Sequence, residues 1–329
     1  MPLPTLAIVT PALADANNGN WQTASRWAHL LGSAFRVRLV TRWTGGDEAV
    51  MVALHARRSA DSVMAWRTVH PGRPLVLVLT GTDLYRDIAS DASAQRSLEL
   101  ADVLVVLNTL GVHMLPAHLR SKVRVVLPSC SERTMVHKTG HHLRAVMVGH
   151  LRAEKDPLTF FKAARRLREQ PGIYLDHIGA ALDPGLGRQA EILQTECPRY
   201  RWLGALPHEA TRRRIQRAHV LVHPSRMEGG AHVVIEAVRS GTPVLASRID
   251  GNVGLLGAAY SGYFAPGDAD DLASRLMHLH RSRDTLAELT AQAMECSRQY
   301  SAEHEARDVF DIIQSLGSAE AEAAPALSR

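Results

Sequence analysis

The chain has 329 residues, 46% of them hydrophobic and 22% charged, and a formal net charge of +5. This length exceeds one ordinary hydrophobic core and predicts two domains of about 150 residues each. No segment approaches the ~18 uninterrupted apolar residues of a membrane span, which excludes a transmembrane helix. The first apolar run lacks the preceding positive charges of a secretion signal, and the three cysteines have no metal or redox spacing. We therefore expect a cytoplasmic protein.

Short apolar runs alternate with helical patterns along the chain. Runs rich in Leu and β-branched residues are typical of strands buried on both faces of a parallel sheet. In the first half they are residues 6–9, 37–40, 50–54, 75–79, 103–107 and 123–127. A second series comprises residues 145–148, 174–178, 202–203, 220–222, 244–246 and 263–264. Amphipathic stretches such as 21–31 and 59–69 separate them, so two doubly wound α/β domains are predicted.

A polar stretch without apolar periodicity separates the two series and is the expected linker. After Asp268 the chain looks helical to about Ser315, and the last residues resemble a disordered tail. The expected divisions are an N-terminal domain at 1–128, the linker at 129–142, a C-terminal domain at 143–316 and the tail at 317–329. The linker contains three histidines, but no carboxylate or thiolate at ligand spacing, so no metal site is expected there.

One basic run, Arg212, Arg213, Arg214 and Arg217, falls on an expected surface helix. It is compatible with a solvated helix face and with attachment to a membrane surface or to nucleic acid. Aromatic residues make up only 5% of the chain and do not alternate with basic ones, so a nucleic-acid partner is not expected. A positive net charge also suits an enzyme whose ligands are all anions.

The stretch Pro224–Ala237, PSRMEGGAHVVIEA, follows an expected strand and leads into a helix. Gly229 and Gly230 allow a tight turn and a close approach of the backbone to a ligand. The free amides and the dipole of a helix N-terminus favour a diphosphate. The residues expected to supply these amides are Ala231, His232 and Val233.

Glu228 and Glu236 flank this expected diphosphate site, with seven residues between them. A carboxylate accepts two hydrogen bonds at once, which suits a vicinal diol. One glutamate is therefore expected to hold ribose hydroxyls and the other hexose hydroxyls. For either glutamate alone, a surface loop residue or a helix-dipole partner is the simpler interpretation. The combination of strand, Gly-Gly turn, helix and two spaced glutamates favours the ligand site.

A second constellation, VGHLRAEKDP, occupies Val148–Pro157 and leaves the first strand of the second domain. Gly149 lets the chain turn at the carboxyl end of the strand, where open α/β sheets bind ligands. Lys155 can reach back to a phosphate as a point charge, the alternative being an exposed lysine at a helix start. His150 and Arg152 are further candidate donors.

Acceptor chemistry is expected in three loops that follow strands of the first domain. The first loop contains Asn18, Gly19 and Asn20, directly before a helix. Gly19 lets backbone amides approach an anion, and the asparagine side chains can donate hydrogen bonds. A simple turn with an Asn helix cap is the alternative.

The second loop contains His55, Arg57 and Arg58, and the third contains Thr82 and Asp83. Arginine guanidinium groups bind phosphate-like anions with two hydrogen bonds, and two cations at a helix start oppose the helix dipole. The two arginines are therefore expected either to bind an anion or to be exposed surface residues at the start of a helix. Asp83 is expected to be either a general base or a helix N-cap.

The two second-domain motifs resemble those of the retaining nucleotide-sugar glycosyltransferases of the GT-B class (GT4-like). The signature of that class is Glu-x7-Glu after a strand, matched by Glu228 and Glu236, with Gly-Arg-x4-Lys upstream, matched by Gly149 and Lys155. His150 replaces the arginine. The resemblance implies two Rossmann-like domains that face each other across a cleft. It also implies a nucleotide sugar, most often of UDP, and no required metal or other cofactor.

A narrower resemblance is to the selenosugar synthases of selenoneine biosynthesis (SenB type). The segments that carry it are TPALADANNGNWQTASRWA, ALHARRSA, LTGTDLYRDIASDA, RYRWLGALPH, SRMEGGAHVVIEA and VLASRIDGNVGLLG. It implies that selenophosphate attacks the anomeric carbon of UDP-N-acetylglucosamine or UDP-glucose. The implied products are a 1-seleno-sugar, UDP and phosphate.

This chemistry is consistent with the candidate residues. Selenophosphate is already an anion, so it needs cationic positioning more than a base. Lys155 and the helix amides would stabilise the leaving UDP, while Asp83 or Glu228 would stabilise an oxocarbenium-like centre. The alternatives are transfer of the sugar to a hydroxyl acceptor, a UDP-sugar epimerase, which fits the two glutamates poorly, and a nucleotide-sugar sensor without catalysis.

Overall fold

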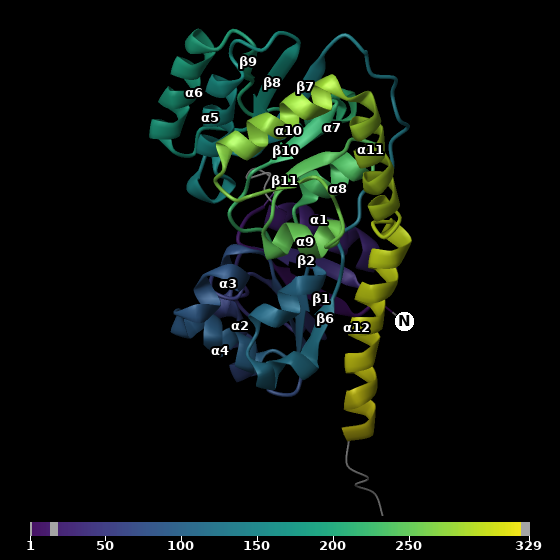
Figure 1. Ribbon diagram of the computed structural model, residues 1–329. Helices are drawn as coiled ribbons and strands as arrows, with labels where there is room; N and C mark the ends of the chain where they lie inside the picture. The colour runs from purple at the N-terminus through teal and green to yellow at the C-terminus, as the bar shows by residue number, and fades with distance from the viewer. Residues whose placement is uncertain (1, 14–18, 324–329) are drawn as a thin grey trace, which may run out of the picture. The chain divides into compact units, whose positions relative to one another are not determined.

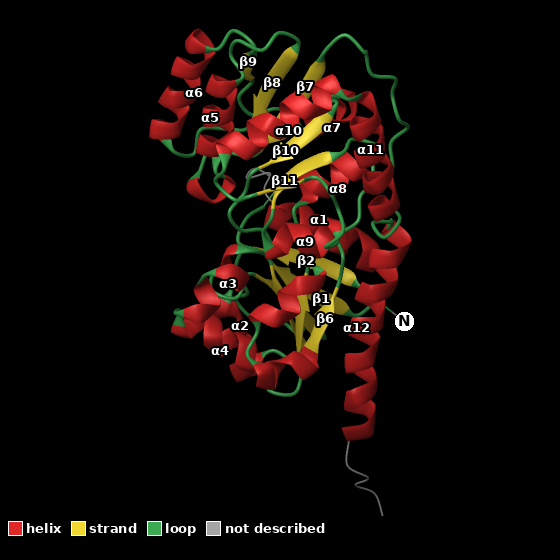
Figure 2. Ribbon diagram, viewed as in Figure 1, coloured by secondary structure: helices red, strands yellow, loops and turns green. Residues whose placement is uncertain are grey.

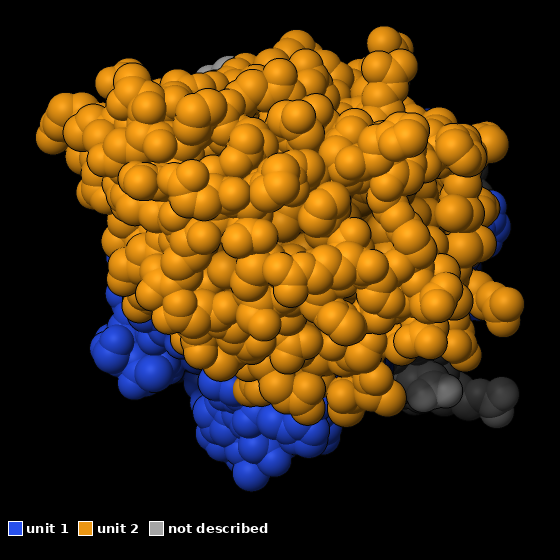
Figure 3. All heavy atoms as spheres, turned by 45° about the horizontal axis from the view of Figure 1, so that its top comes forward, with its two compact units in different colours: residues 1–129, 302–329 blue, residues 130–301 orange. Residues whose placement is uncertain are grey.

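The structure, a computed structural model, describes residues 2–13 and 19–323 and contains two parallel sheets of six strands each. The chain divides into two compact units, which Figure 3 colours separately. Unit 1 comprises residues 1–129 and 302–329, and unit 2 comprises residues 130–301. Strands and helices alternate in both units (Figures 1 and 2), as the sequence predicts. No helix in the described ranges is long and apolar enough to cross a membrane.

Unit 1 is built on a parallel sheet with the strand order β2-β1-β3-β4-β5-β6. Its strands are β1 (Thr5–Val9), β2 (Arg36–Val40), β3 (Val50–Leu54), β4 (Leu75–Leu79), β5 (Val103–Val106) and β6 (Val123–Val125). Its α-helices are α1 (Gly19–Leu31), α2 (Ala60–Val69), α3 (Thr82–Tyr85), α4 (Ala92–Leu100) and α12 (Ala302–Ala323). Short 3-10 helices lie at Asp87–Ala89, Thr109–Met114 and Ala117–Lys122.

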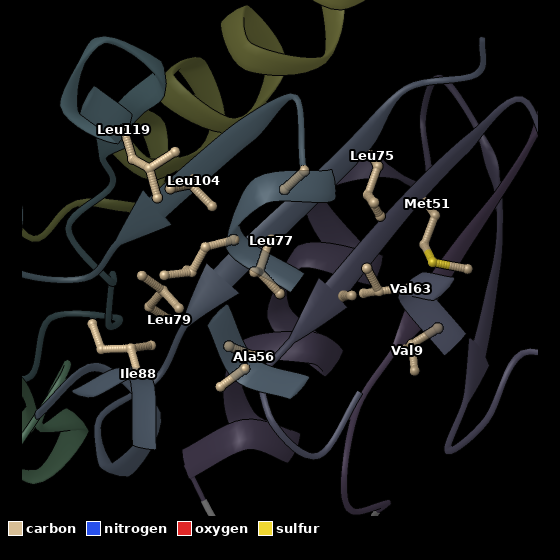
Figure 4. Packing of buried hydrophobic residues seen from close by; sticks show 14 of the residues in the cluster. Val9, Met51, Ala56, Val63, Leu75, Leu77, Leu79, Ile88, Leu104 and Leu119 are labelled. Atoms are coloured by element: carbon tan, nitrogen blue, oxygen red, sulfur yellow. The ribbon is translucent and has the colours of Figure 1, made fainter. Parts of the chain in front are cut away.

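Alternate residues of the unit 1 strands enter two separate cores, one on each face of the sheet. On one face Val9, Met51 and Leu77 pack with residues of α2 and α4, as Figure 4 shows for part of this cluster. On the other face the neighbouring residues Ile8 and Val52 pack with residues of α1 and α12. The sheet is therefore covered on both faces, which explains why its inner strands β3, β4 and β5 are entirely apolar.

Helix α12 corrects the expected domain boundaries. The sequence assigned residues up to 316 to the C-terminal domain, whereas α12 belongs to unit 1. Its Val309, Ile312 and Ile313 are buried in the core of unit 1. The expected tail begins at residue 317, but the helix continues to Ala323, and the rest of that expected tail lies outside the described residues.

Unit 2 has the strand order β12-β11-β10-β7-β8-β9. Its strands are β7 (Leu143–Val148), β8 (Ile173–Ile178), β9 (Tyr200–Trp202), β10 (Val220–His223), β11 (Val244–Ser247) and β12 (Tyr263–Phe264). Its α-helices are α5 (Pro157–Arg166), α6 (Pro184–Glu196), α7 (His208–Arg217), α8 (His232–Val238), α9 (Asp250–Leu256), α10 (Ala269–Arg281) and α11 (Arg283–Ser297). A 3-10 turn at Ala153–Lys155 precedes α5. The expected linker forms no helix or strand, and its Arg133 and Lys138 donate hydrogen bonds to backbone carbonyls of Arg239 and Gly241.

Candidate functional site

The two expected donor-binding segments of unit 2 meet at one point of its sheet. Strands β7 and β10 are neighbours, and the strand order reverses direction between them. In open α/β sheets, ligands bind outside the carboxyl ends of the strands at such a switch point. The loops that leave these two strands carry Gly149–Lys155 and Glu228–Ala231. The Arg226 amide donates a hydrogen bond of 2.9 Å to the Glu154 carbonyl, which joins the loops.

Lys155 and Glu228 form an ion pair at this junction. The Lys155 Nζ lies 2.6 Å from Glu228 Oε1, and His223 Nε2 lies 3.2 Å from the same oxygen. Glu228 is 9% exposed, and His223 is buried at the end of β10. Burial alone would raise the pKa of Glu228, but the Lys155 charge and His223 outweigh it and hold that pKa well below its ordinary value. The carboxylate therefore stays ionised at neutral pH.

Close backbone packing fixes the loop that carries Glu228. A Cβ atom built on Gly251 of α9 would lie 1.9 Å from the Glu228 carbonyl oxygen. Only glycine allows α9 to approach the loop this closely. On the facing loop, Asp156 has a φ of 44° and accepts a hydrogen bond of 2.8 Å from the Thr159 hydroxyl. Arg226 lies 3.2 Å from the same carboxylate oxygen, which ties the two loops together a second time.

The remaining residues of the first motif surround the start of its loop. The Lys155 side chain lies across Gly149, and an added Cβ there would be 3.4 Å from Lys155 Cγ and Cδ. His150 Nδ1 accepts a hydrogen bond of 3.0 Å from the Ala180 amide. Burial, together with Arg152 and Lys155, lowers the pKa of His150. The ring is thus neutral at pH 7. Arg152 is half-buried, and its Nε has no hydrogen-bond partner among the residues that the structure describes.

The second glutamate, Glu236, lies inside α8 and pairs with His208 at the start of α7. The distance between His208 Nε2 and Glu236 Oε1 is 2.5 Å. The hydrogen bond to Glu236 raises the pKa of His208, although burial opposes it. Ala231 is the N-cap of α8, and no side chain caps it. Gly229 and Gly230 precede it; neither has a positive φ, so the expected tight turn does not use a left-handed glycine. His232 and Val233, which begin α8, are half-exposed.

In unit 1 the strand order reverses between β1 and β3, so its switch point lies by residues 10–13, which follow β1, and residues 55–59, which follow β3. His55 directly follows β3 and has a φ of 73°, a strained conformation for a histidine. Residues held in such conformations cluster at functional sites. Asn18 lies outside the described residues. Gly19 and Asn20 begin α1, and no atom of the described residues lies within 4 Å of a Cβ built on Gly19.

The hydrogen bonds of His55 fix its protonation. Its Nδ1 accepts from the Arg58 amide at 3.3 Å, so its Nε2 carries the proton and donates to the Thr82 hydroxyl at 3.1 Å. Burial is the main cause of a lowered His55 pKa; Arg57 and Arg58 add to it, while Asp83 opposes it. The ring is therefore neutral and has no free acceptor.

Asp83 does not have the geometry of a general base. It is fully buried, and its carboxylate accepts hydrogen bonds of 2.9 Å from the amides of Ala56, Thr80 and Gly81. The N-cap alternative is not found either, because Gly81 is the N-cap of α3. Asp83 instead joins the loops that follow β3 and β4. Its expected role at the reacting carbon is not supported by these contacts.

The two arginines of the second loop differ in their partners. Arg57 Nε donates to Asp87 Oδ2 at 2.8 Å, and Arg86 occupies the other oxygen of Asp87 at 2.9 Å. Arg58 is exposed, and its guanidinium forms no ion pair with the described residues. Arg58 is therefore the better candidate for binding an anionic acceptor, while Arg57 is partly neutralised.

Sequence reasoning missed His223 and His208, which contact Glu228 and Glu236. Both lie within 30 residues of the glutamates in the chain, but neither belongs to the motif. His223 is the last residue of β10, and its position directly before the loop was the available signal. His208 follows a proline at the start of α7, and only the fold brings α7 beside α8. Across the described ranges, no group of three or more His, Cys, Asp or Glu side chains could hold a metal ion.

Comparison with known proteins agrees with the geometry of unit 2. Residues 137–295 match the sequence model of the family described as glycosyl transferases group 1. The "Glycosyltransferase 1 domain-containing protein 1" of Xenopus tropicalis is 31% identical over 144 residues, which are 43% of this chain and 42% of that protein. The match thus spans about two fifths of that relative. The match to the family model covers residues 137–295, which lie within unit 2 and make up slightly less than half of the chain.

Solved structures resemble the whole described chain. Sucrose-phosphate synthase from Thermosynechococcus elongatus has a TM-score of 0.78 and 16% identity, covering 97% of this chain and 100% of that one. Anabaena HepE in complex with UDP-glucose has a TM-score of 0.71 and 14% identity, covering 98% and 100%. At these identities the likeness concerns the fold, and the fold is that of the GT-B glycosyltransferases.

Proposed function

We propose that this chain is a selenosugar synthase, which transfers a glycosyl group from UDP-N-acetylglucosamine or UDP-glucose to selenophosphate. The observation that carries the donor half is the Lys155–Glu228 pair at the switch point of unit 2. The match to the group 1 glycosyltransferase family and the UDP-glucose complex of HepE support a nucleotide-sugar donor. The choice of selenophosphate is supported by the sequence resemblance and by the chemistry of unit 1.

The donor is held through its charged and hydroxyl groups. When the donor binds, Lys155 contacts the diphosphate in addition to Glu228. Its charge then stabilises the negative charge that develops on the leaving UDP. Glu228 faces the sugar from the same junction. Glu236, held by His208, accepts hydrogen bonds from the ribose diol. No metal or other cofactor takes part in this proposal.

The acceptor half rests on the state of the candidate bases in unit 1. All three backbone contacts of Asp83 use its carboxylate oxygens, and both nitrogens of His55 are occupied. A hydroxyl nucleophile that needs a base would find none in these two residues. An anionic nucleophile needs no proton removal, and Arg58 is available to attract it. This observation favours selenophosphate over a hydroxyl acceptor.

The reaction balances as follows. Selenium of selenophosphate attacks the anomeric carbon, a Se–C bond forms, and the C–O bond to UDP breaks with its electron pair on the leaving phosphate oxygen. Water then cleaves the Se–P bond. The products are UDP, phosphate and the 1-seleno-sugar.

Mass spectrometry of the products tests the proposal. The purified protein is incubated without oxygen with UDP-N-acetylglucosamine or UDP-glucose, each with and without selenophosphate. A product with the selenium isotope pattern, formed only with selenophosphate, is expected. Arg58→Ala should raise the KM for selenophosphate, whereas Arg96→Ala, an exposed arginine of α4, should not. UDP release without a seleno-sugar would contradict the selenophosphate acceptor and point to a hydroxyl acceptor. If the protein binds UDP-sugars but turns none of them over, the proposal that it is an enzyme is wrong.

A further inference from the structure

A buried pair of polar side chains, His177 and Tyr200, contacts the first residue of the donor loop. His177 on β8 is fully buried; its Nε2 lies 3.2 Å from the Gly149 carbonyl oxygen and its Nδ1 lies 3.2 Å from the Tyr200 hydroxyl. The rings of Phe160 and Phe161 lie 6.0 and 5.9 Å away, centroid to centroid. An ionisable ring in such apolar surroundings requires both of these hydrogen bonds.

The direction of both hydrogen bonds is determined. A carbonyl oxygen only accepts, so His177 Nε2 carries the proton and donates to Gly149. Nδ1 is then unprotonated and accepts from the Tyr200 hydroxyl. Burial lowers the pKa of His177 to about 4 and raises that of Tyr200 well above its usual range. Both groups are neutral at pH 7, so the two hydrogen bonds have one direction, from the Tyr200 hydroxyl to His177 and from His177 to the Gly149 carbonyl.

Contacts hold the residues on both sides of the peptide that joins Gly149 to His150. The Gly149 amide donates to the Ile178 carbonyl at 2.9 Å, and His150 Nδ1 accepts from the Ala180 amide at 3.0 Å. A Cβ built on Gly179 would lie 2.0 Å from the Gly149 carbonyl oxygen. This peptide therefore has little freedom to rotate.

The free end of this peptide is the His150 amide. In a trans peptide the C=O and N–H bonds point in opposite directions. Because His177 holds the Gly149 carbonyl on the side of the core, the His150 N–H points away from His177. Among the described residues this N–H has no hydrogen-bond acceptor. It begins the loop that places Lys155 beside Glu228.

We propose that His177 and Tyr200 are positioning residues that aim the His150 backbone N–H at the diphosphate of the donor. This inference rests on the proposed function, because it requires a nucleoside diphosphate in unit 2. His177 does not contact the donor. It acts by fixing one peptide, so its effect is confined to the phosphates and does not extend to the nucleoside.

Calorimetric titration with UDP and with uridine tests this assignment on three variants of the full chain. His177→Phe removes both hydrogen bonds and should weaken UDP binding about tenfold, since a hydrogen bond to a charged group is lost. Uridine has no phosphate, so its affinity should change less than about twofold. His177→Gln reaches Gly149 through its amide and should keep the UDP affinity within about threefold. His177→Asn has a shorter side chain, cannot reach Gly149 and should behave like His177→Phe.

The possible outcomes separate this inference from the proposed function. If the unaltered protein does not bind UDP, the proposed function fails. If it binds UDP but His177→Phe and His177→Asn bind it equally well, the inference alone fails. An equal loss of UDP and uridine affinity also overturns the inference, because it shows a general structural effect. If His177→Phe does not fold, the comparison of His177→Gln with His177→Asn decides, because both keep a polar amide and differ in reach.

Discussion

At the residue scale, the buried side chain of Asp83 joins two loops of unit 1. Its carboxylate accepts three backbone hydrogen bonds from the loops after β3 and β4. Asp83→Asn turns one acceptor oxygen into an amide donor that faces a backbone N–H. We expect the free energy of unfolding to fall by about 3 kcal/mol, measured by urea denaturation. Asp61→Asn, at a position 71% exposed, should change it by less than about 0.5 kcal/mol. Equal effects of the two substitutions would contradict the anchoring role.

Glu228 makes the stability of unit 2 depend on pH. Its pKa in the folded chain is depressed below the ordinary 4.5, so its stabilising contribution is present above pH 4.5 and is lost as the pH falls further. The difference in unfolding free energy between the unaltered protein and Glu228→Gln should therefore narrow between pH 6 and pH 3. Urea denaturation across this range measures it. A difference that does not vary with pH would show that the ion pair with Lys155 contributes nothing.

At the residue scale, the sequence predicts the donor residues better than their partners. Spacing after an apolar run predicts that Lys155 and Glu228 lie at one sheet edge, and they form an ion pair. It did not reveal that His223 also contacts Glu228, because the position of His223 directly before the loop does not specify its partner. The three backbone donors to Asp83 could not be predicted either, because nearly every residue has a backbone amide and the sequence does not distinguish them.

At the scale of the elements, the close approach of α9 fixes the position of the loop that carries Glu228. A Cβ on Gly251 would collide with the Glu228 carbonyl at 1.9 Å. Gly251→Ala should therefore displace the loop and weaken UDP binding at least about tenfold, with a lower melting temperature. Gly72→Ala is the matched control, because nothing lies within 4 Å of its added Cβ. Calorimetry of both variants measures the effect, and unchanged UDP binding by Gly251→Ala would contradict it.

Helix α12 is tied to unit 1 by one buried carboxylate. Glu305 accepts hydrogen bonds from the side chains of Arg26 and Trp27 and from both the amide and the hydroxyl of Ser129. Glu305→Ala leaves the Arg26 charge without this partner, so we expect a loss of about 3–5 kcal/mol. Asp311→Ala, at an exposed position of the same helix, should cost less than about 0.5 kcal/mol. Urea unfolding monitored by tryptophan fluorescence distinguishes them; similar losses would disprove the anchor.

The positions of the helices and strands could largely be predicted from the sequence, whereas the unit to which α12 belongs could not. All twelve strands fall on the predicted apolar runs, with bounds that shift by at most two residues. Buried parallel strands give continuous apolar runs, which are an unambiguous signal. The apolar residues of α12 predict a helix, but periodicity does not tell which core receives Val309 and Ile313. Sequence order therefore misplaced this helix.

At the scale of the whole molecule, the two units share one plan and differ in chemistry. Each has a six-stranded parallel sheet with polar residues at the point where the strand order reverses. Unit 2 presents Lys155 with two buried glutamates, which suits a nucleotide sugar. Unit 1 presents an exposed Arg58 and a neutral His55, which suits an anion that requires no base. The sequence predicted this division because both sets of loops directly follow recognisable strands.

Hydrogen exchange with and without UDP tests whether the donor binds at the switch point of unit 2. Exchange of backbone amides is followed by mass spectrometry of peptides that cover the chain. If the donor binds there, UDP slows exchange at residues 149–156 and 224–236. Protection confined to other segments, or none at UDP concentrations that saturate calorimetric binding, would contradict this placement of the donor.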